Sequence, residues 1–135
     1  MSFIIWTDDF SVGVAQFDSD HRKLIEYINT LHIGMISGHG LSEMSEILDA
    51  LVDYTRFHFK READLMEKFF YPDYESHKSE HELFIEKVND FISLYKKGKK
   101  AFTLELMSFL RDWLTNHIKG TDMKYRDFFL AKGVK

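Results

Sequence analysis

Apolar residues recur at steps of three and four along four stretches of this sequence, and this periodicity constrains the fold more than any other feature. Such steps place side chains on one face of an α-helix, so each stretch predicts a helix that buries one face. Breaks at Gly38, Pro72 and Gly98 separate the stretches, because glycine weakens a helix and proline interrupts it. The expected helices cover roughly 19–37, 42–67, 73–96 and 101–119, and a shorter C-terminal helix covers 121–131.

The loops between the four expected helices are only a few residues long, which favours helices that run antiparallel to their sequence neighbours. The sequence therefore predicts an all-α, antiparallel up-down-up-down four-helix bundle as one domain over residues 1–135. Residues 1–17 show no sustained helical period and are interrupted by Gly13, so we interpret them as an N-terminal arm. Asp18 or Ser19 is the expected cap of the first helix, because short polar side chains accept hydrogen bonds at helix starts.

The charge balance and the residue types exclude several classes of protein. The formal net charge is -4 at pH 7, so the chain lacks the basic excess that a nucleic-acid-binding surface needs. It has no cysteine, which excludes disulfides, iron–sulfur clusters and thiolate zinc sites. No apolar run approaches the roughly 20 residues of a membrane span, and no basic region precedes the apolar start of the chain. We therefore expect a soluble, cytoplasmic protein, and a monomer because no additional apolar face is evident.

Histidines from separate helices fall at one depth of the expected bundle. His21 lies as far before the first loop as His58 lies after it, so these two residues share a level. His81 and His117 are level about the third loop to within a residue or so. All four also fall on the apolar face of their own helix, where a buried imidazole needs a compensating partner.

Two further candidate ligands follow from a spacing of four residues. Glu62 follows His58 by four residues, so both side chains lie on one face of a helix. His77 precedes His81 by the same spacing. Counted from the second loop, the two pairs agree in depth within about one turn, which is roughly 5 Å of rise.

His32 and His39 lie away from this level. His32 is about 16 Å from His21 along the helix axis, and no other histidine or acid shares its level on an inward face. We interpret His32 as a hydrogen-bonded or partly exposed core histidine. His39 lies in a glycine-flanked loop and is expected to face solvent.

The donor set is too large for one tetrahedral zinc ion, which takes four ligands. Asp122 follows His117 across an expected helix break at Gly120, which brings the set to five histidines and two carboxylates. Such a set suits two metal ions bridged by the carboxylates, and iron suits it better than manganese or zinc. The odd number of nitrogens leaves one metal with a vacant position, where a small diatomic molecule can bind. Neither the Glu-x-x-His pairs of ferritin-like oxidases nor the His-Glu-x-x-His motif of zinc proteases occurs.

The complete donor pattern resembles the ligand set of the hemerythrin family, and the resemblance covers essentially the whole chain. The pattern reads His21, His58-x-x-x-Glu62, His77-x-x-x-His81 and His117-x-x-x-x-Asp122. The arm is similar to that of the bacterial branch of the family, the bacteriohemerythrins, since it carries Trp6, Phe10 and Gly13 ahead of Asp18.

The resemblance implies reversible binding of dioxygen, for storage, delivery or scavenging. It implies two Fe ions, cycling between Fe2+ and Fe3+ and joined by an oxo or hydroxo bridge. It also implies three histidines on the six-coordinate iron, two on the iron with the open position, and two bridging carboxylates. These ligands are His77, His81 and His117, then His21 and His58, and finally Glu62 and Asp122.

An apolar wall beside the ligands is expected to keep water and protons from the bound gas. Its candidates, which are equally ordinary core residues, are Leu24, Ile25, Phe59, Trp113, Leu114 and Ile118. Asp18 and Asp20 are candidates to orient the histidine rings by accepting hydrogen bonds from them.

The main hypothesis is a binding protein and not an enzyme. Its expected ligand is dioxygen, with nitric oxide and azide-like anions as further candidates and with no nucleic-acid partner. One alternative is a sensing module in which oxygen, redox state or nitric oxide moves the N-terminal arm. Another alternative is a di-iron enzyme of the peroxidase type or one that reduces nitric oxide.

Overall fold

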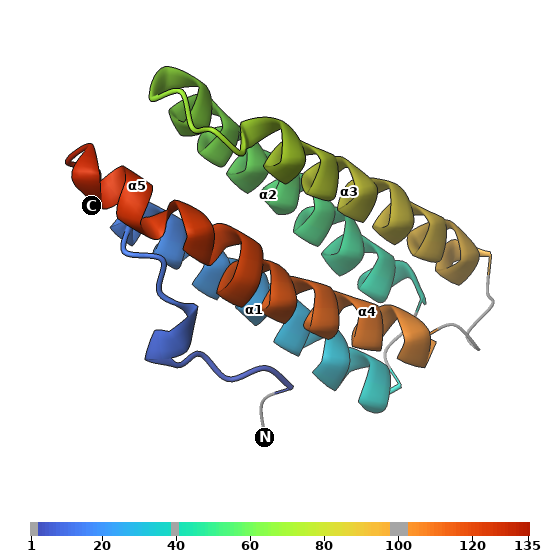
Figure 1. The fold of residues 1–135 in the computed structure, drawn as a ribbon. Coiled ribbons are helices and arrows are strands. Elements are labelled where there is room, and N and C mark those ends of the chain that lie inside the picture. The colour runs from blue at the N-terminus through green and yellow to red at the C-terminus, as the bar shows by residue number, and fades with distance from the viewer. Residues whose placement is uncertain (1–2, 39–40, 98–102) are drawn as a thin grey trace.

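Four long helices lie side by side in the computed structural model, which describes residues 3–38, 41–97 and 103–135 (Figure 1). No strand occurs within these described ranges. The expected positions of His39 and of a helix start at residue 101 lie outside them. The long helices are α1 (Ala15–Ile36), α2 (Leu41–Lys68), α3 (Tyr74–Lys96) and α4 (Thr103–Asn116), and a short helix, α5 (Arg126–Ala131), follows near the C-terminus.

Helices that are adjacent in sequence pack against each other, and α4 closes the bundle by contacting both α1 and α3 (Figure 1). The connection after α2 turns tightly, because Phe70 adopts a φ of 59° and the Tyr71 amide donates to the Met66 carbonyl at 2.9 Å. Pro72 then lies between α2 and α3, outside both helices. The structure confirms the predicted all-α antiparallel four-helix bundle.

The inward faces of the helices carry the core. Its largest fully buried side chains include Phe17, Ile28, Leu31, Leu48, Leu51, Leu110 and Phe129. Among the described residues, no helix is both long enough and apolar enough to cross a membrane.

The first helix begins earlier than the sequence predicted. The α1 helix starts at Ala15, because no residue between Val14 and Asp18 stops it, and Gly13 with a φ of 78° marks the turn just before it. Asp18 therefore does not cap the helix from outside. Its carboxylate instead accepts hydrogen bonds from the Ser11 hydroxyl at 2.6 Å and the Val12 amide at 2.8 Å, which ties the arm to α1.

The rest of the arm is also fastened to α1. Asn29 donates to the Ile4 carbonyl at 2.9 Å and accepts from the Ile4 amide at 2.8 Å. The half-buried His32 ring stacks on Phe3 with ring centroids 4.2 Å apart. His32 thus lies apart from the other inward histidines, as expected from its depth.

Candidate metal centre

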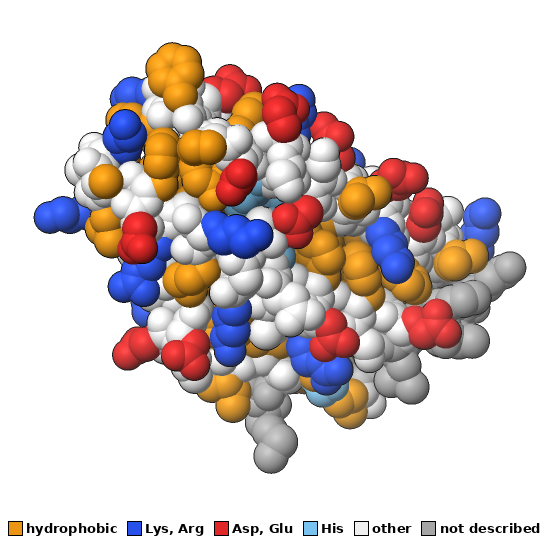
Figure 2. Space-filling model, viewed as in Figure 1, with side chains coloured by type: hydrophobic (Ala, Val, Ile, Leu, Met, Phe, Trp, Pro, Cys, Tyr) orange, Lys and Arg blue, Asp and Glu red, His pale blue; other side chains and the backbone are white. Residues whose placement is uncertain are grey.

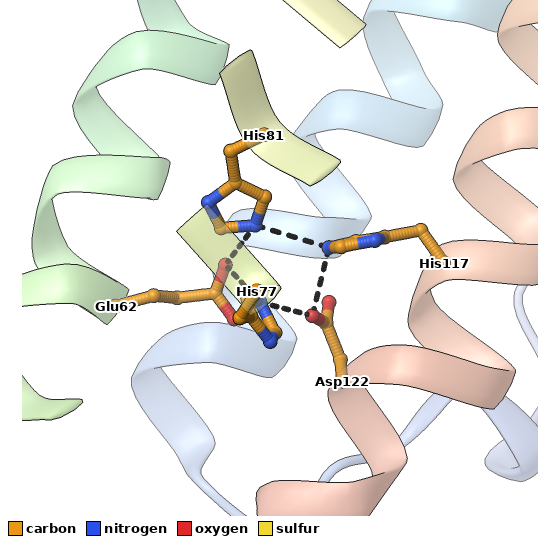
Figure 3. A group of neighbouring side chains, drawn as sticks. All are labelled: Glu62, His77, His81, His117 and Asp122. Carbon is orange, nitrogen blue, oxygen red and sulfur yellow. Dashed lines mark hydrogen bonds and ion pairs between the residues drawn. The ribbon is translucent and has the colours of Figure 1, made fainter. Parts of the chain in front are cut away.

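Seven buried polar side chains from α1, α2, α3 and the turn after α4 meet in the middle of the bundle. They form two overlapping groups, in each of which the candidate ligand atoms lie within 4.8 Å of one another. One group contains Glu62, His77, His81, His117 and Asp122, and the other contains His21, His58, Glu62 and Asp122. Figure 3 shows the first group, whose three imidazoles and two carboxylates point toward a common centre. The structure thus brings together every candidate ligand named from the sequence, and Glu62 and Asp122 belong to both groups.

Regular helix geometry positions four of these side chains. His58 and Glu62 are one turn apart on α2, and His58 Nε2 lies 3.0 Å from Glu62 Oε1. His77 and His81 are one turn apart on α3, with ring centroids 4.5 Å apart. Because residues four apart share a helix face, both pairs reach the centre without any distortion of their helices.

A π-helical turn positions the remaining pair, His117 and Asp122. Residues five apart on a regular α-helix point about 140° away from each other, which would separate the two side chains. The chain instead forms a π-helical turn over His117–Thr121, which accommodates one extra residue per turn. His117 Nε2 consequently lies 3.0 Å from Asp122 Oδ1.

The expected helix break at Gly120 was therefore wrong. The helical path continues from α4 through the π-helical turn into a 3-10 turn, Asp122–Tyr125, and then into α5. A Cβ at Gly120 would meet no atom within 4 Å, so no close packing requires glycine there. Gly120 marks a change in helix geometry and not the end of a helix, because a π-helical turn accommodates an extra residue while the backbone hydrogen bonds continue.

Several buried nitrogens and oxygens of the cluster lie close together without the geometry of a hydrogen bond among the described residues. His21 Nε2 lies 3.2 Å from Asp122 Oδ2, and His77 Nε2 lies 2.9 Å from Asp122 Oδ1, yet none of these four atoms has a hydrogen-bond partner within the part of the chain that the structure describes. His81 Nε2 and His117 Nε2 lie 3.0 Å apart, and two ring nitrogens at this distance can share only one proton. Unpaired polar atoms are rare in native interiors because burying them is costly. Cations between the nitrogens and oxygens would satisfy these atoms, and imidazole with carboxylate is a donor set that fits iron.

The protonation states of the cluster also favour a cation. Burial and the charge of Asp122 raise the pKa of Glu62, but the summed effects of the neighbouring histidines, including His58 and His81, bring this pKa down to about 2. Burial also raises the pKa of Asp122, yet the neighbouring histidines keep it well below its usual range. Burial is the main cause that lowers the pKa of His81 to about 3. Ionised carboxylates and a neutral imidazole are the forms that bind metals.

His58 differs from His81 in its protonation. Burial lowers the pKa of His58, but the negative charge of Glu62 and the hydrogen bond to Asp20 raise it to about 10. Without a metal, this ring therefore carries a proton at neutral pH. Metal binding at His58 Nε2 would release that proton.

Asp20 orients the His58 ring from outside the cluster. Its carboxylate accepts a hydrogen bond from His58 Nδ1 at 2.8 Å, which leaves His58 Nε2 to face the centre. Arg61 donates to both oxygens of Asp20, at 3.1 and 2.9 Å, and the Tyr54 hydroxyl donates at 3.0 Å. Although burial raises the pKa of Asp20, His58 and Arg61 bring it below its usual value.

The sequence named Asp20 and Asp18 as partners for the histidine rings. Asp20 accepts a hydrogen bond from the His58 ring, whereas the prediction for Asp18 was wrong, because the Asp18 carboxylate accepts hydrogen bonds from the N-terminal arm instead. Arg61 and Tyr54 were missed, although both lie about one turn from His58 on α2, and this spacing is the signal that could have found them.

Other polar side chains support the bridging region and His117. The buried Tyr125 hydroxyl donates to Glu62 Oε2 at 2.5 Å, which fixes the outer oxygen of this carboxylate. Glu80 Oε1 lies 3.6 Å from His117 Nδ1 and accepts a hydrogen bond from the Thr121 hydroxyl at 3.0 Å. Both contacts come from the turns after α4 and could not be placed before the π-helical turn was known.

Aromatic rings stack on two of the histidines. Phe59 is nearly parallel to His81, with ring centroids 3.6 Å apart and an interplanar angle of 3°. Trp113 stacks on His117 with centroids 4.3 Å apart and an angle of 13°. The two rings therefore fix the planes of these imidazoles by packing instead of by hydrogen bonds.

A small, almost wholly apolar cavity of about 10 Å³ lies beside the stacked rings. Its lining consists of Leu24, Ile28, Leu51, Thr55, Phe59, Phe84, Leu110, Trp113 and Leu114. Thr55 carries the one hydroxyl among the described residues of that lining, and this hydroxyl donates to the Leu51 carbonyl at 2.7 Å. Four of the six pocket residues named from the sequence line the cavity, whereas Ile25 and Ile118 are buried elsewhere in the core. Helical periodicity predicts that a residue faces the core, but it does not predict which part of the core the residue lines.

The fold is an antiparallel four-helix bundle, and two overlapping groups of histidines and carboxylates lie at its middle. These two features define the class of the protein, a helical bundle with a candidate two-metal centre. A comparison with protein families narrows this class. The profile of the hemerythrin HHE cation binding domain matches residues 12–128, so the chain belongs to the hemerythrin family.

Relatives and solved structures agree with this assignment. A bacteriohemerythrin of Stenotrophomonas maltophilia is 38% identical over 127 residues, which cover 94% of this chain and 82% of the relative. A bacteriohemerythrin of Methylococcus capsulatus is 34% identical and is covered to 95%, with 93% of this chain aligned. A crystal structure of wild-type hemerythrin superposes with a TM-score of 0.86 at 33% identity, covering 93% of this chain and 97% of that chain.

Proposed function

We propose that this chain binds dioxygen reversibly at two iron ions held by the seven clustered side chains. The observation that carries the proposal is the overlap of the two groups, because Glu62 and Asp122 belong to both and can bridge two metals. The remaining ligands then divide unequally. His77, His81 and His117 would hold one iron, and His21 and His58 would hold the other, which keeps a coordination position free.

The iron pair, when bound, would supply the two electrons that dioxygen takes up on binding and returns on release. The chain itself would supply the positions of the ligands and the surroundings of the gas. Asp20 holds the His58 ring through Nδ1, and Tyr125 holds the outer oxygen of Glu62. Such outer contacts keep ligands in one orientation while the metals change charge.

The cavity beside the stacked rings supports a carrier over an enzyme. None of the described residues that line it is an acid or a base, and the Thr55 hydroxyl is already bonded to a backbone carbonyl. No acid or base in that lining is therefore available to deliver protons to a bound ligand. Excluding water and protons favours release of unchanged dioxygen over its further reduction.

The decisive experiment records metal content and visible spectra through one cycle of oxygenation. The full-length chain is reduced without air, exposed to oxygen and then degassed. We expect two irons per chain and a visible charge-transfer band that appears with oxygen and disappears under vacuum. Irreversible oxidation without that band, or rapid turnover of peroxide or nitric oxide, would overturn the carrier proposal in favour of an enzyme.

A further inference from the structure

A surface groove between α2 and α3 reaches the metal centre from outside. Its volume is about 420 Å³, and its lining includes Phe59, Ala63 and Ile85 together with the edges of His77 and His81. Figure 2 shows the neighbouring face, where histidine surface is visible between α3 and the segment of α4 and α5, among charged and hydrophobic side chains. The groove is open to solvent, whereas the apolar cavity described above is smaller and is lined mostly by buried side chains.

Phe59 belongs to both spaces. It lines the groove and also the inner cavity, and its side chain is only half-buried. Its ring packs flat on His81, and its neighbours on the cavity side are Phe84 and Trp113, with ring centroids 6.0 and 6.1 Å away. The Phe59 side chain therefore lies between the open groove and the inner cavity.

We propose that the groove between α2 and α3 is the entrance by which a small apolar ligand reaches the inner cavity, and that the Phe59 ring is its gate. The identity of that ligand as dioxygen rests on the proposed function. The gate opens by rotation of one side chain and needs no movement of the backbone.

The rims of the groove do not seal it. Charged side chains line both rims, with Arg56 and Lys60 on the α2 side and with Lys78, Glu82 and Glu86 on the α3 side. In the described part of the chain no ion pair joins these residues across the groove, and Lys60 pairs with Asp64 on its own helix. Closure therefore depends on the aromatic ring below the rims. An apolar ring admits a nonpolar gas more readily than hydrated ions, which lose their water on entry.

Quenching of Trp113 fluorescence by dissolved oxygen tests the route without using iron chemistry, because Trp113 lines the inner cavity. A Trp6→Phe background leaves Trp113 as the single tryptophan, since the chain has two. Lifetimes are measured on the full-length chain in metal-free and metal-loaded forms. We expect Phe59→Ala to raise the bimolecular quenching constant about tenfold, the effect of a barrier lower by about 1.4 kcal/mol.

Leu51→Ala is the matched control for Phe59→Ala. Leu51 is on the same helix and lines the inner cavity, but it does not reach the groove. The Leu51→Ala variant should have a larger cavity, but its quenching constant should change less than about twofold, since the entrance stays closed. Equal increases in both variants would overturn the gate, because they would show that cavity size alone controls access.

A second pair of variants tests the groove from outside. Ala63→Phe fills the groove and should slow quenching severalfold, whereas Leu83→Phe, at an exposed position of α3 outside the groove, should have no effect. Stopped-flow association of oxygen with the reduced iron protein should follow the same order. Unchanged rates in Ala63→Phe would overturn the entrance. A chain that holds no iron would instead remove the proposed function and leave the quenching comparison interpretable.

Discussion

The two halves of the metal centre are held by different forces. In the two-histidine half, formed by His21 and His58, a network of hydrogen bonds through Asp20 fixes the His58 ring. In the three-histidine half, formed by His77, His81 and His117, stacked aromatic rings fix two of the imidazoles.

This difference separates two tasks. A carboxylate behind an imidazole raises its basicity and strengthens its hold on a metal. A stacked aromatic ring adds little charge but excludes water and shapes the space for an apolar ligand. The hydrogen-bonded half is therefore suited to tuning one metal, whereas the stacked half controls access.

The largest effect is expected from removing a carboxylate that both halves of the metal centre share. Glu62→Ala deletes a carboxylate common to both groups and leaves buried imidazoles without compensation. We expect loss of both irons, measured as metal content per chain by mass spectrometry. Glu46→Gln, an exposed substitution on the same helix, should keep both irons. An alanine variant that retained two irons would contradict the bridging role of Glu62.

The next largest effect is expected from changing the number of residues in the π-helical turn. Inserting one alanine after Gly120 would place Asp122 six residues after His117 and rotate it by about 100° relative to His117. We expect the centre to lose its metals while circular dichroism shows that the helices persist. Gly120→Ala is the control, because its Cβ meets no atom within 4 Å and it leaves the residue count unchanged. Equal metal loss in both variants would show that glycine at this position, and not the spacing of His117 and Asp122, is needed.

A smaller effect should fall on one half alone. Asp20→Asn weakens the hydrogen bond behind His58, so iron in the two-histidine half should bind about 10–100-fold more weakly. Competition with a chelator should then release the two irons in separate steps. Glu26→Gln, at an exposed position of α1, should leave release unchanged. Equal weakening of both irons in Asp20→Asn would refute a role confined to His58.

The smallest expected effect lies outside both halves. Asp18→Asn weakens the contacts of its carboxylate with Ser11 and Val12, which should lower the free energy of unfolding by about 1–2 kcal/mol. Urea denaturation measures this change. Iron affinity should stay as in the unmodified chain, and an altered affinity would mean that the arm acts on the metal centre.

The bundle and the candidate ligands could be predicted because each depended on local periodicity. Pairs such as His58 and Glu62 share a helix face by spacing alone, and loop positions then set the relative depth of the helices. The start of α1 was misplaced because Asp18 is as common at a helix cap as within a first turn. The hydrogen bond from Tyr125 to Glu62 was missed because side-chain hydrogen bonds between helices depend on how the helices rotate about their axes, which periodicity does not fix.

The π-helical turn also has a consequence for protein engineering. A two-metal centre of this kind cannot be copied onto an ideal bundle by transplanting side chains position for position. The recipient helix needs either the π-helical turn of His117–Thr121 or a spacing of four residues between the two donors, because five residues of a regular helix turn the second acid about 140° away. A backbone designed for uniform pitch would present six of the seven donors correctly and aim the last one at a neighbouring helix.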